Sequence, residues 1–239
     1  MDPRGQALKR HSSHMLQFRP GADVSMLNAI MHVIVEEGLY DDDYVAKYTE
    51  NWEAQKEHLK AFSPEKMAPI CGIDAEMLRD VARTFANAKA GMIFWGMGVS
   101  QHIHGTDNSR CLISLAFMTG NVGKPGAGLH PLRGQNNVQG ASDAGMIPMF
   151  LPDYQPVSDD GVRSAFTEVW KSEDFSSEAG LTVVEIIEAI HNDNIKAMYI
   201  LGENPAMSDP DVEHARDALS KLDHLVVQDI FLTETANYA

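Results

Sequence analysis

One short segment concentrates the side chains that could do chemistry. Residues 132–140 read Leu-Arg-Gly-Gln-Asn-Asn-Val-Gln-Gly, which places one guanidinium, four side-chain amides and two glycines close together. Buried amides need hydrogen-bond partners, so this segment is unsuited to an ordinary core element. The planar fork of Arg133 suits a carboxylate or a phosphate. The segment is therefore predicted to bind such a ligand, or else to be a solvated loop in which Arg133 pairs with a carboxylate such as Asp143.

The segments on either side favour a functional loop. Residues 119–128 and 140–146 are rich in glycine and other small residues. With the central segment they make about 28 residues of mostly irregular chain, a length that is usually functional or disordered. The low net charge of the stretch and its lack of low-complexity sequence argue against disorder.

Hydrophobic periodicity predicts the elements that must position this loop. Strands are expected over residues 14–18, 91–95, 196–201 and 224–228. Helices are expected over residues 24–37, 41–48, 51–61, 64–70, 75–86, 106–118, 181–191 and 209–222, with a further one near 163–170. The order of strands and helices predicts an α/β fold: a Rossmann-like parallel sheet with crossover helices plus a small helical insertion.

The predicted domains are incomplete parts of a larger subunit. Residues 1–23 are expected to end one cofactor-binding α/β domain, residues 24–88 to be the helical insertion, and residues 89–239 to form a Rossmann-like domain. Three predicted strands end at Gly96-Met97-Gly98, Gly202-Glu203-Asn204 and Gln228-Asp229. Ligands of such sheets lie beyond the carboxyl ends of the strands, so these residues predict a nucleotide-bearing ligand. Neither common glycine-rich phosphate motif is present to identify it.

Composition excludes several classes of function. A net charge of −15 argues against a nucleic-acid partner, whose phosphates require lysine and arginine. No apolar stretch reaches the roughly 20 residues of a membrane span. Cys71 and Cys111 are too few for a disulfide framework, and Cys111 is interpreted as a core residue. His102 and His104 lack partners at metal-ligand spacing, so no metal ligand is predicted in this chain.

The motifs together resemble a known family. Residues 96–101, 119–126 and 133–140 are similar to the catalytic (alpha) subunit of the molybdenum- or tungsten-dependent formate dehydrogenases. These enzymes belong to the dimethyl-sulfoxide-reductase superfamily, which holds the metal between two molybdopterin guanine dinucleotides. The resemblance covers essentially the whole chain, and residues 133–140 are its most specific part.

The resemblance implies a role for each of twelve residues. Arg133 would be the active-site arginine beside the metal, and Gln135 would hydrogen-bond the pterin. Met97 and Gln101 would contact the pterin or its pyrophosphate. One guanine dinucleotide would be held by Gly202, Asn204, Ser208, Gln228 and Asp229, and part of a guanosine by Arg4, Gly21 and Asp23. For Asp23 the alternative is a cap of the following helix.

The resemblance also implies a longer parent protein. The family's catalytic cysteine or selenocysteine, its adjacent histidine and its iron–sulfur cysteines have no counterparts here, so the chain is expected to be an internal fragment, inactive alone. The parent would oxidise formate to CO₂ reversibly and pass electrons through iron–sulfur clusters to electron-transfer subunits in the cytoplasm. The resemblance does not determine whether the metal is molybdenum or tungsten, or which molecule finally accepts the electrons. The alternatives are a nitrate reductase or other molybdopterin oxidoreductase, a non-catalytic guanine-nucleotide-binding module, or an unrelated Rossmann enzyme.

Overall fold

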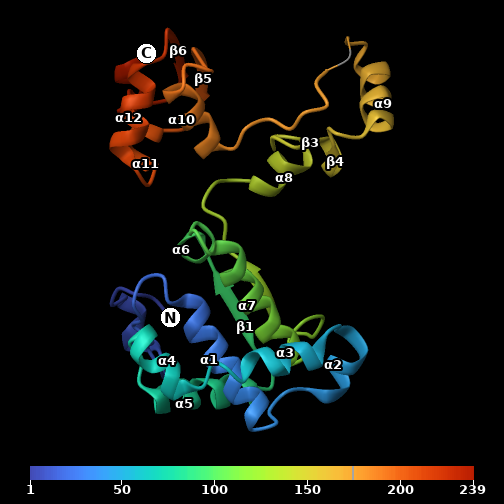
Figure 1. The fold of residues 1–239 in the computed structure, drawn as a ribbon, viewed down its shortest axis with the longest axis vertical. Coiled ribbons are helices and arrows are strands. Elements are labelled where there is room, and N and C mark those ends of the chain that lie inside the picture. Colours follow the sequence, from blue (N-terminus) through green and yellow to red (C-terminus); the bar gives the residue numbers. More distant parts are fainter. Residues whose placement is uncertain (174) are drawn as a thin grey trace. The chain divides into compact units, whose positions relative to one another are not determined.

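The computed structural model describes residues 1–173 and 175–239. The chain forms two compact units, residues 1–136 and 137–239 (Figure 1). Each unit contains a pair of parallel strands connected through helices, which confirms the predicted α/β class. The domain boundaries predicted at residues 23 and 88 stay predictions.

A central helix organises the first unit. The helices are α1 (Asp23–Glu36), α2 (Asp42–Tyr48), α3 (Trp52–Leu59), α4 (Pro64–Cys71) and α5 (Ala75–Ala86), after a short 3₁₀ turn, η1 (Ala7–His11). Helix α1 packs against α3, α4, α5 and α7 (Gly105–Met118), and its Ile30 and Ile34 have no exposed surface. A helix that is apolar over most of its surface is stable only when neighbours surround it. The predicted helical region therefore shares one core with the strand and helix that follow it.

The first unit contains one parallel strand pair. Strand β1 (Met92–Trp95), the short helix α6 (Met97–Ser100), α7 and strand β2 (Gly128–Pro131) follow in order, with Met92 opposite Gly128 and Trp95 opposite Pro131. Strand β2 and helix α8 (Val138–Asp143) lie in the stretch predicted to be mostly irregular, so that prediction was wrong for these residues. Gly128 and Pro131 at the two ends conceal the strand in the sequence, because glycine and proline are poor strand formers.

The N-terminal segment differs from its prediction as well. Residues 14–18 are extended but form no strand. The backbone N–H of Asp2 donates to the carbonyl of Leu16 at 3.1 Å, and Leu16 and Phe18 are buried in the core around α1. The alternating apolar residues that suggest a strand instead anchor an irregular segment to the helices.

The glycine-rich segment after α7 has a structural role. The backbone N–H of Gly91 donates to Asn121 Oδ1 at 2.8 Å, and Asn121 Nδ2 donates to Thr119 Oγ1 at 2.9 Å. Thr119 Oγ1 in turn donates to the carbonyl of Leu115 at 2.7 Å. Gly120 has a φ of 61°, which favours glycine and turns the chain between Thr119 and Asn121. This buried network joins the end of α7 to the start of β1.

The second unit contains the other parallel pair. Its elements are α8 (Val138–Asp143), β3 (Phe150–Leu151), η2 (Pro152–Tyr154), β4 (Gln155–Pro156), α9 (Asp160–Trp170), α10 (Val183–His191), β5 (Ala197–Leu201), α11 (Pro205–Ser208), α12 (Val212–Ser220), β6 (His224–Gln228) and η3 (Thr235–Tyr238). Strands β5 and β6 are parallel, with Leu201 opposite Gln228. Ile190, Ala218, Leu219 and Leu225 are buried between these strands and helices α10 and α12.

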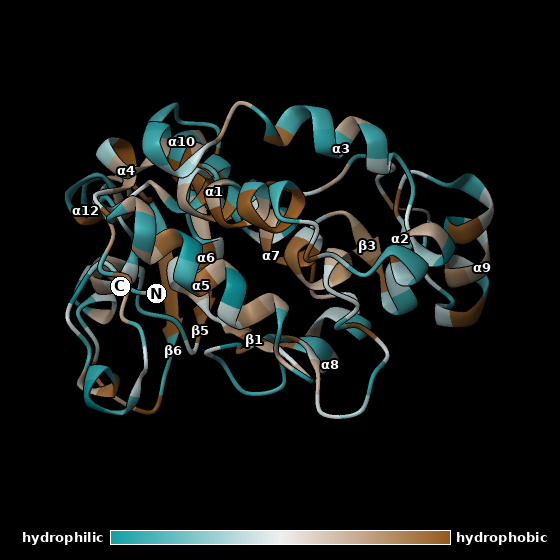
Figure 2. Ribbon diagram, turned by 90° about the horizontal axis from the view of Figure 1, so that it is seen from below, coloured by the Kyte–Doolittle hydropathy of each residue, from teal (hydrophilic) through white to brown (hydrophobic). Residues whose placement is uncertain are grey.

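Hydropathy follows this architecture. Figure 2 shows hydrophobic residues in β1, β5 and β6, and hydrophilic residues over much of α3. One face of each parallel pair is nevertheless open: Phe94 is 56% exposed and Tyr199 is 59% exposed. Within the described part of the chain, no helix is both long enough and apolar enough to cross a membrane.

Candidate functional site

The first unit brings two predicted loops to one edge. Because β1 and β2 are parallel, the residues after Trp95 and Pro131 leave the strand pair side by side. The N–H of Leu132 donates to the carbonyl of Trp95 at 2.6 Å. A Cβ added to Gly134 would lie 3.1 Å from Met97 Cε, so Met97 contacts the backbone between Arg133 and Gln135. The structure thus joins three of the predicted cofactor or catalytic residues.

Arg133 is exposed at this edge. The hydrogen bonds and ion pairs found in the described residues of its unit include none to its guanidinium, and none to the side chain of Gln135. Asp143, the alternative partner, belongs to the other unit. An exposed guanidinium with its five donors unused can hold a small oxyanion in a bidentate manner.

Asp23 lies near the same edge. Gln101 ends α6, where its N–H donates to the carbonyl of Met97 at 2.7 Å. The next residue, His102, places its Nε2 3.9 Å from Asp23 Oδ2. The prediction that Asp23 caps α1 was wrong: Ala22 is the N-cap residue, and no side chain completes the cap. Asp23 is instead the first helical residue, where the helix dipole favours a carboxylate.

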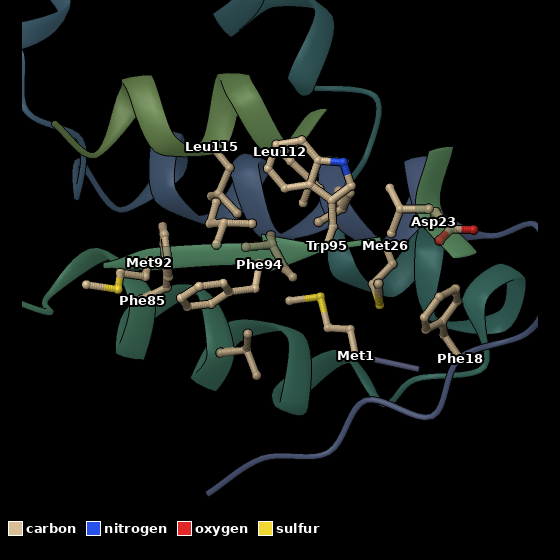
Figure 3. A pocket seen from close by; sticks show the side chains of 15 residues that line it. Met1, Phe18, Asp23, Met26, Phe85, Met92, Phe94, Trp95, Leu112 and Leu115 are labelled. Carbon is tan, nitrogen blue, oxygen red and sulfur yellow. The ribbon is translucent and has the colours of Figure 1, made fainter. Parts of the chain in front are cut away.

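An apolar pocket lies beside β1. Figure 3 shows side chains of the N-terminal segment, α1, α5 and β1 around it, with Asp23 near one end. The cavity measures about 260 Å³, and Asp23 is the single charged residue in its lining. Its labelled lining is Met1, Phe18, Asp23, Met26, Phe85, Met92, Phe94, Trp95, Leu112 and Leu115. Such a lining is unsuited to a phosphate.

Two predicted residues make no hydrogen bond to the loops at this edge in the described part of the chain. Arg4 is exposed, and its N–H donates to Asp2 Oδ1 at 2.7 Å. Gly21 has a φ of 83° in the turn before α1. None of the described hydrogen bonds or ion pairs connects either residue to Met97 or Arg133.

The second unit gathers five predicted residues at its own strand edge. The N–H of Gly202 donates to the carbonyl of Gln228 at 2.9 Å, which joins the loops after β5 and β6. Gly202 has a φ of 64°, and a Cβ there would meet nothing within 4 Å, so a ligand can approach its backbone. Asp229 Oδ1 accepts from the N–H of Ile230 at 2.6 Å and of Phe231 at 3.2 Å. Ser208 is exposed at the end of α11.

Sequence reasoning missed Glu234 and Thr235. Asn204 Nδ2 donates to Glu234 Oε2 at 2.7 Å, and this bond holds the pKa of the Glu234 carboxyl below its usual value. Thr235 is fully buried and contacts Asn204 from 31 residues away. The polar run Thr-Glu-Thr soon after a predicted strand was the signal available in the sequence.

The exposed groups fit a pterin guanine dinucleotide. Heterocycles with mixed donors and acceptors match the amides of Gln135 and Gln228, and a carboxylate such as Asp229 can accept from the N–H groups of guanine. The open backbone at Gly98 and Gly202, where a Cβ would meet no atom within 4 Å, allows close approach of a pyrophosphate. These donors and acceptors therefore suit such a cofactor.

Comparison with known proteins places the chain among its relatives. It is 47% identical over 239 residues to the formate dehydrogenase subunit alpha of Methanocaldococcus jannaschii, covering all of this chain and 35% of the relative. It is 40% identical over 238 residues to formate dehydrogenase H of Escherichia coli, covering 33% of that protein. A nitrate reductase of Synechocystis is 33% identical over 242 residues. The chain spans about a third of the length of the curated relatives it matches.

The fold has a counterpart among solved structures. Acetylene hydratase from Pelobacter acetylenicus superposes with a TM-score of 0.72 at 20% sequence identity, over all of this chain and 35% of that one. At this identity the likeness shows a shared fold. The model of the family described as Molybdopterin oxidoreductase matches residues 1–239. The chain therefore belongs to the molybdopterin oxidoreductase family.

Proposed function

We propose that this chain is part of the catalytic subunit of a formate dehydrogenase, which oxidises formate to CO₂, one proton and two electrons. The observation that carries the proposal is the exposed Arg133, which lies two residues after β2 and next to Gly134, whose backbone Met97 contacts. The names of the relatives support it, because the formate dehydrogenase subunits are more similar to this chain than the nitrate reductase is.

The proposed cofactor is a bis-(molybdopterin guanine dinucleotide) with molybdenum or tungsten. Gln135, Met97 and Gln101 would hold its pterin at the edge of the first unit. Gly202, Asn204, Ser208, Gln228 and Asp229 would hold one guanine dinucleotide, and Arg4, Gly21 and Asp23 part of a guanosine. When bound, the metal centre supplies the acceptor for the two electrons that formate loses.

Arg133 contributes binding and orientation. Its two terminal nitrogens can donate to both oxygens of formate, which fixes the plane of the substrate and turns its C–H bond away from the guanidinium. Formate is an anion and CO₂ is neutral, so the electrostatic attraction is lost when the product forms. Arg133 therefore favours binding of formate and release of CO₂ from the same site.

Substitution of Arg133 in the complete, cofactor-loaded subunit tests this role. Arg133→Ala is expected to lower kcat/KM for formate by about 100-fold or more, since it removes two charge-assisted hydrogen bonds worth roughly 1.5–3 kcal/mol each. Arg133→Lys keeps the charge without the fork and is expected to fall in between. Lys89→Ala removes an exposed cation elsewhere and serves as the control. Turnover of Arg133→Ala within a few-fold of wild type would refute the role.

A nitrate reductase is the second candidate, favoured by the 33% identical relative. Nitrate is also a planar oxyanion, so Arg133 could bind it in the same way. The same preparation of the complete subunit is assayed with formate and with nitrate. Turnover of nitrate alone would transfer the assignment to this candidate, and turnover of neither would favour a module that only binds a guanine nucleotide.

The proposed partners are the remainder of the catalytic subunit and electron-transfer subunits that take electrons from iron–sulfur clusters, in the cytoplasm. The support is that a similar relative is named as subunit alpha. Co-purification of the complete protein from its source, followed by iron analysis and cell fractionation, tests the partners, the clusters and the compartment. A catalytic subunit that purifies alone without iron would contradict this part of the proposal.

A further inference from the structure

One asparagine ties together the loops that follow β5 and β6. Thr235 donates to Asn204 Oδ1 twice, from its backbone N–H at 3.1 Å and from its Oγ1 at 2.7 Å. Asn204 Nδ2 donates to Glu234 Oε2 at 2.7 Å. Both lone pairs of the Asn204 amide oxygen are therefore used, and one N–H of the amide is left for any other partner.

Thr235 is the buried centre of this arrangement. It has no exposed surface, and its Oγ1 also accepts from the N–H of Ala206 at 3.1 Å. The carbonyl of Ala206 accepts from Arg216 Nε at 2.8 Å, so α11 is anchored through both backbone groups of one residue. A buried hydroxyl that both donates and accepts is costly to replace with an apolar group.

The same two loops are joined at their other end. The N–H of Gly202 donates to the carbonyl of Gln228, and Asp229 Oδ1 accepts from the two residues after it. The segment 229–235 is thus fixed at its start by β6 and at its end by Asn204. The separation between Gly202 and Asp229 is consequently set by bonds at both ends.

We infer that Asn204, Thr235 and Glu234 form a positioning clamp that holds the two loops in the arrangement that binds the guanine dinucleotide. This inference rests on the proposed function. It gives Asn204 a role through the loops, beside the direct contact with the cofactor that family resemblance implies. Thr235 and Glu234 acquire a role that no motif assigned to them.

Reversal of the donor and the acceptor in the hydrogen bond between Asn204 and Glu234 distinguishes the two roles of Asn204, which are positioning the loops and contacting the cofactor directly. In the complete, cofactor-loaded subunit, Asn204→Asp places a second carboxylate against Glu234. We expect the bound guanine nucleotide to dissociate about tenfold faster, equivalent to one lost hydrogen bond. The double variant Asn204→Asp with Glu234→Gln restores a donor opposite an acceptor and is expected to return retention to the wild-type value. Failure of this rescue would show that Asn204 acts on the cofactor directly, and would overturn the clamp.

A matched pair at Thr235 provides the second test. Thr235→Val keeps the volume but leaves the N–H of Ala206 without its acceptor, so retention of the nucleotide is expected to fall by about tenfold. Thr235→Ser keeps the hydroxyl and is expected to retain the nucleotide as wild type does. Wild-type retention in Thr235→Val contradicts the inference. If Thr235→Val does not fold, the Asn204 and Glu234 variants, which alter less buried side chains, still decide the question.

The readout distinguishes the clamp from the proposed activity. Guanine nucleotide is measured as GMP released by acid hydrolysis for each subunit, and formate turnover is measured separately. A protein that binds nucleotide and responds to these variants but oxidises no formate refutes the formate proposal and supports the clamp. Formate turnover together with unaltered nucleotide retention in every variant supports the formate proposal and refutes the clamp.

Discussion

At the scale of single residues, the contact between Gly134 and Met97 brings the loops after β1 and β2 together at the candidate site. A Cβ at Gly134 would lie 3.1 Å from the methyl group of Met97, closer than an ordinary van der Waals contact. A side chain at position 134 would therefore require Met97 to shift by a few tenths of an ångström. In another part of the first unit, an ion pair connects the end of helix α1 to helix α5. Arg83 Nε donates to Glu37 Oε2 at 2.9 Å and Arg83 Nη2 to Glu37 Oε1 at 2.7 Å.

This ion pair predicts a pH-dependent contribution to stability. The bonds from Arg83 hold the pKa of the Glu37 carboxyl below its usual value. A lowered pKa in the folded state means that the contribution is present at neutral pH and is lost as the pH falls through that pKa. Glu37→Gln is expected to lower the free energy of unfolding at pH 7 by about 1 kcal/mol or less, because both side chains are partly exposed. The difference from wild type should begin to shrink as the pH falls below the usual pKa of a glutamate, about 4.3, and should disappear only below the lowered pKa of Glu37.

Urea unfolding at pH 7 and in acid measures this effect. Glu50→Gln removes an exposed carboxylate that makes no ion pair in the described structure, and is the matched control. An equal loss of stability at every pH in Glu37→Gln would show that packing, and not the charge, is responsible.

At the scale of elements, the strand pairs are positioned by buried polar groups as well as by apolar packing. Asn121 satisfies the N–H of Gly91 at the start of β1, and Thr119 connects Asn121 to the last turn of α7. Gly91 is itself confined, since a Cβ there would lie 2.9 Å from the Phe85 ring. The beginning of β1 is thereby fixed against α5 and α7, and its carboxyl end places Met97.

Removal of the Asn121 amide tests this network. Asn121→Ala leaves the N–H of Gly91 without its acceptor, and is expected to lower the free energy of unfolding by about 2 kcal/mol. Asn87→Ala removes an amide that donates to the carbonyl of Arg83 on an exposed helix end, and is expected to cost about 0.5 kcal/mol or less. Denaturant unfolding of both variants gives the comparison. An equal loss of unfolding free energy in both variants would mean that the buried hydrogen bonds contribute no more to stability than the exposed one.

At the scale of the whole molecule, the two units have separate cores. The first core is built around α1, and the second lies between β5, β6, α10 and α12. In each unit, predicted cofactor residues follow the carboxyl ends of the parallel strands: Met97 and Gln135 in the first unit, and Gly202 and Asp229 in the second. The division of the chain after residue 136 falls within the polar segment that contains Arg133.

Cavity-forming substitutions should therefore act unit by unit. Ile30→Ala and Leu219→Ala each remove a fully buried side chain, at an expected cost of about 3 kcal/mol. Hydrogen exchange is expected to accelerate in α4, α5 and α7 for Ile30→Ala, and in β5 and β6 for Leu219→Ala. Faster exchange of α12 in Ile30→Ala, to the same degree as in α4, would contradict the separation of the cores.

The sequence by itself determined much of the local structure and identified the family. Helix α1 forms because its apolar side chains recur at helical spacing, and β5 and β6 were predictable from short apolar runs. The family was recognisable from residues 133–140, which combine a guanidinium, side-chain amides and glycines. Helix formation, strand formation and the motif depend on residues that are close together in the chain, so the sequence alone is enough to predict them.

Only the tertiary structure decided which segments meet. Strand β1 pairs with β2, whose glycine and proline conceal it, and Asn204 pairs with Thr235 across 31 residues. Asp23 begins α1 without capping it, and its carboxylate lies near His102. Such partners are chosen by burial and by the need to satisfy every buried donor and acceptor, and these constraints act between segments that are distant in the chain.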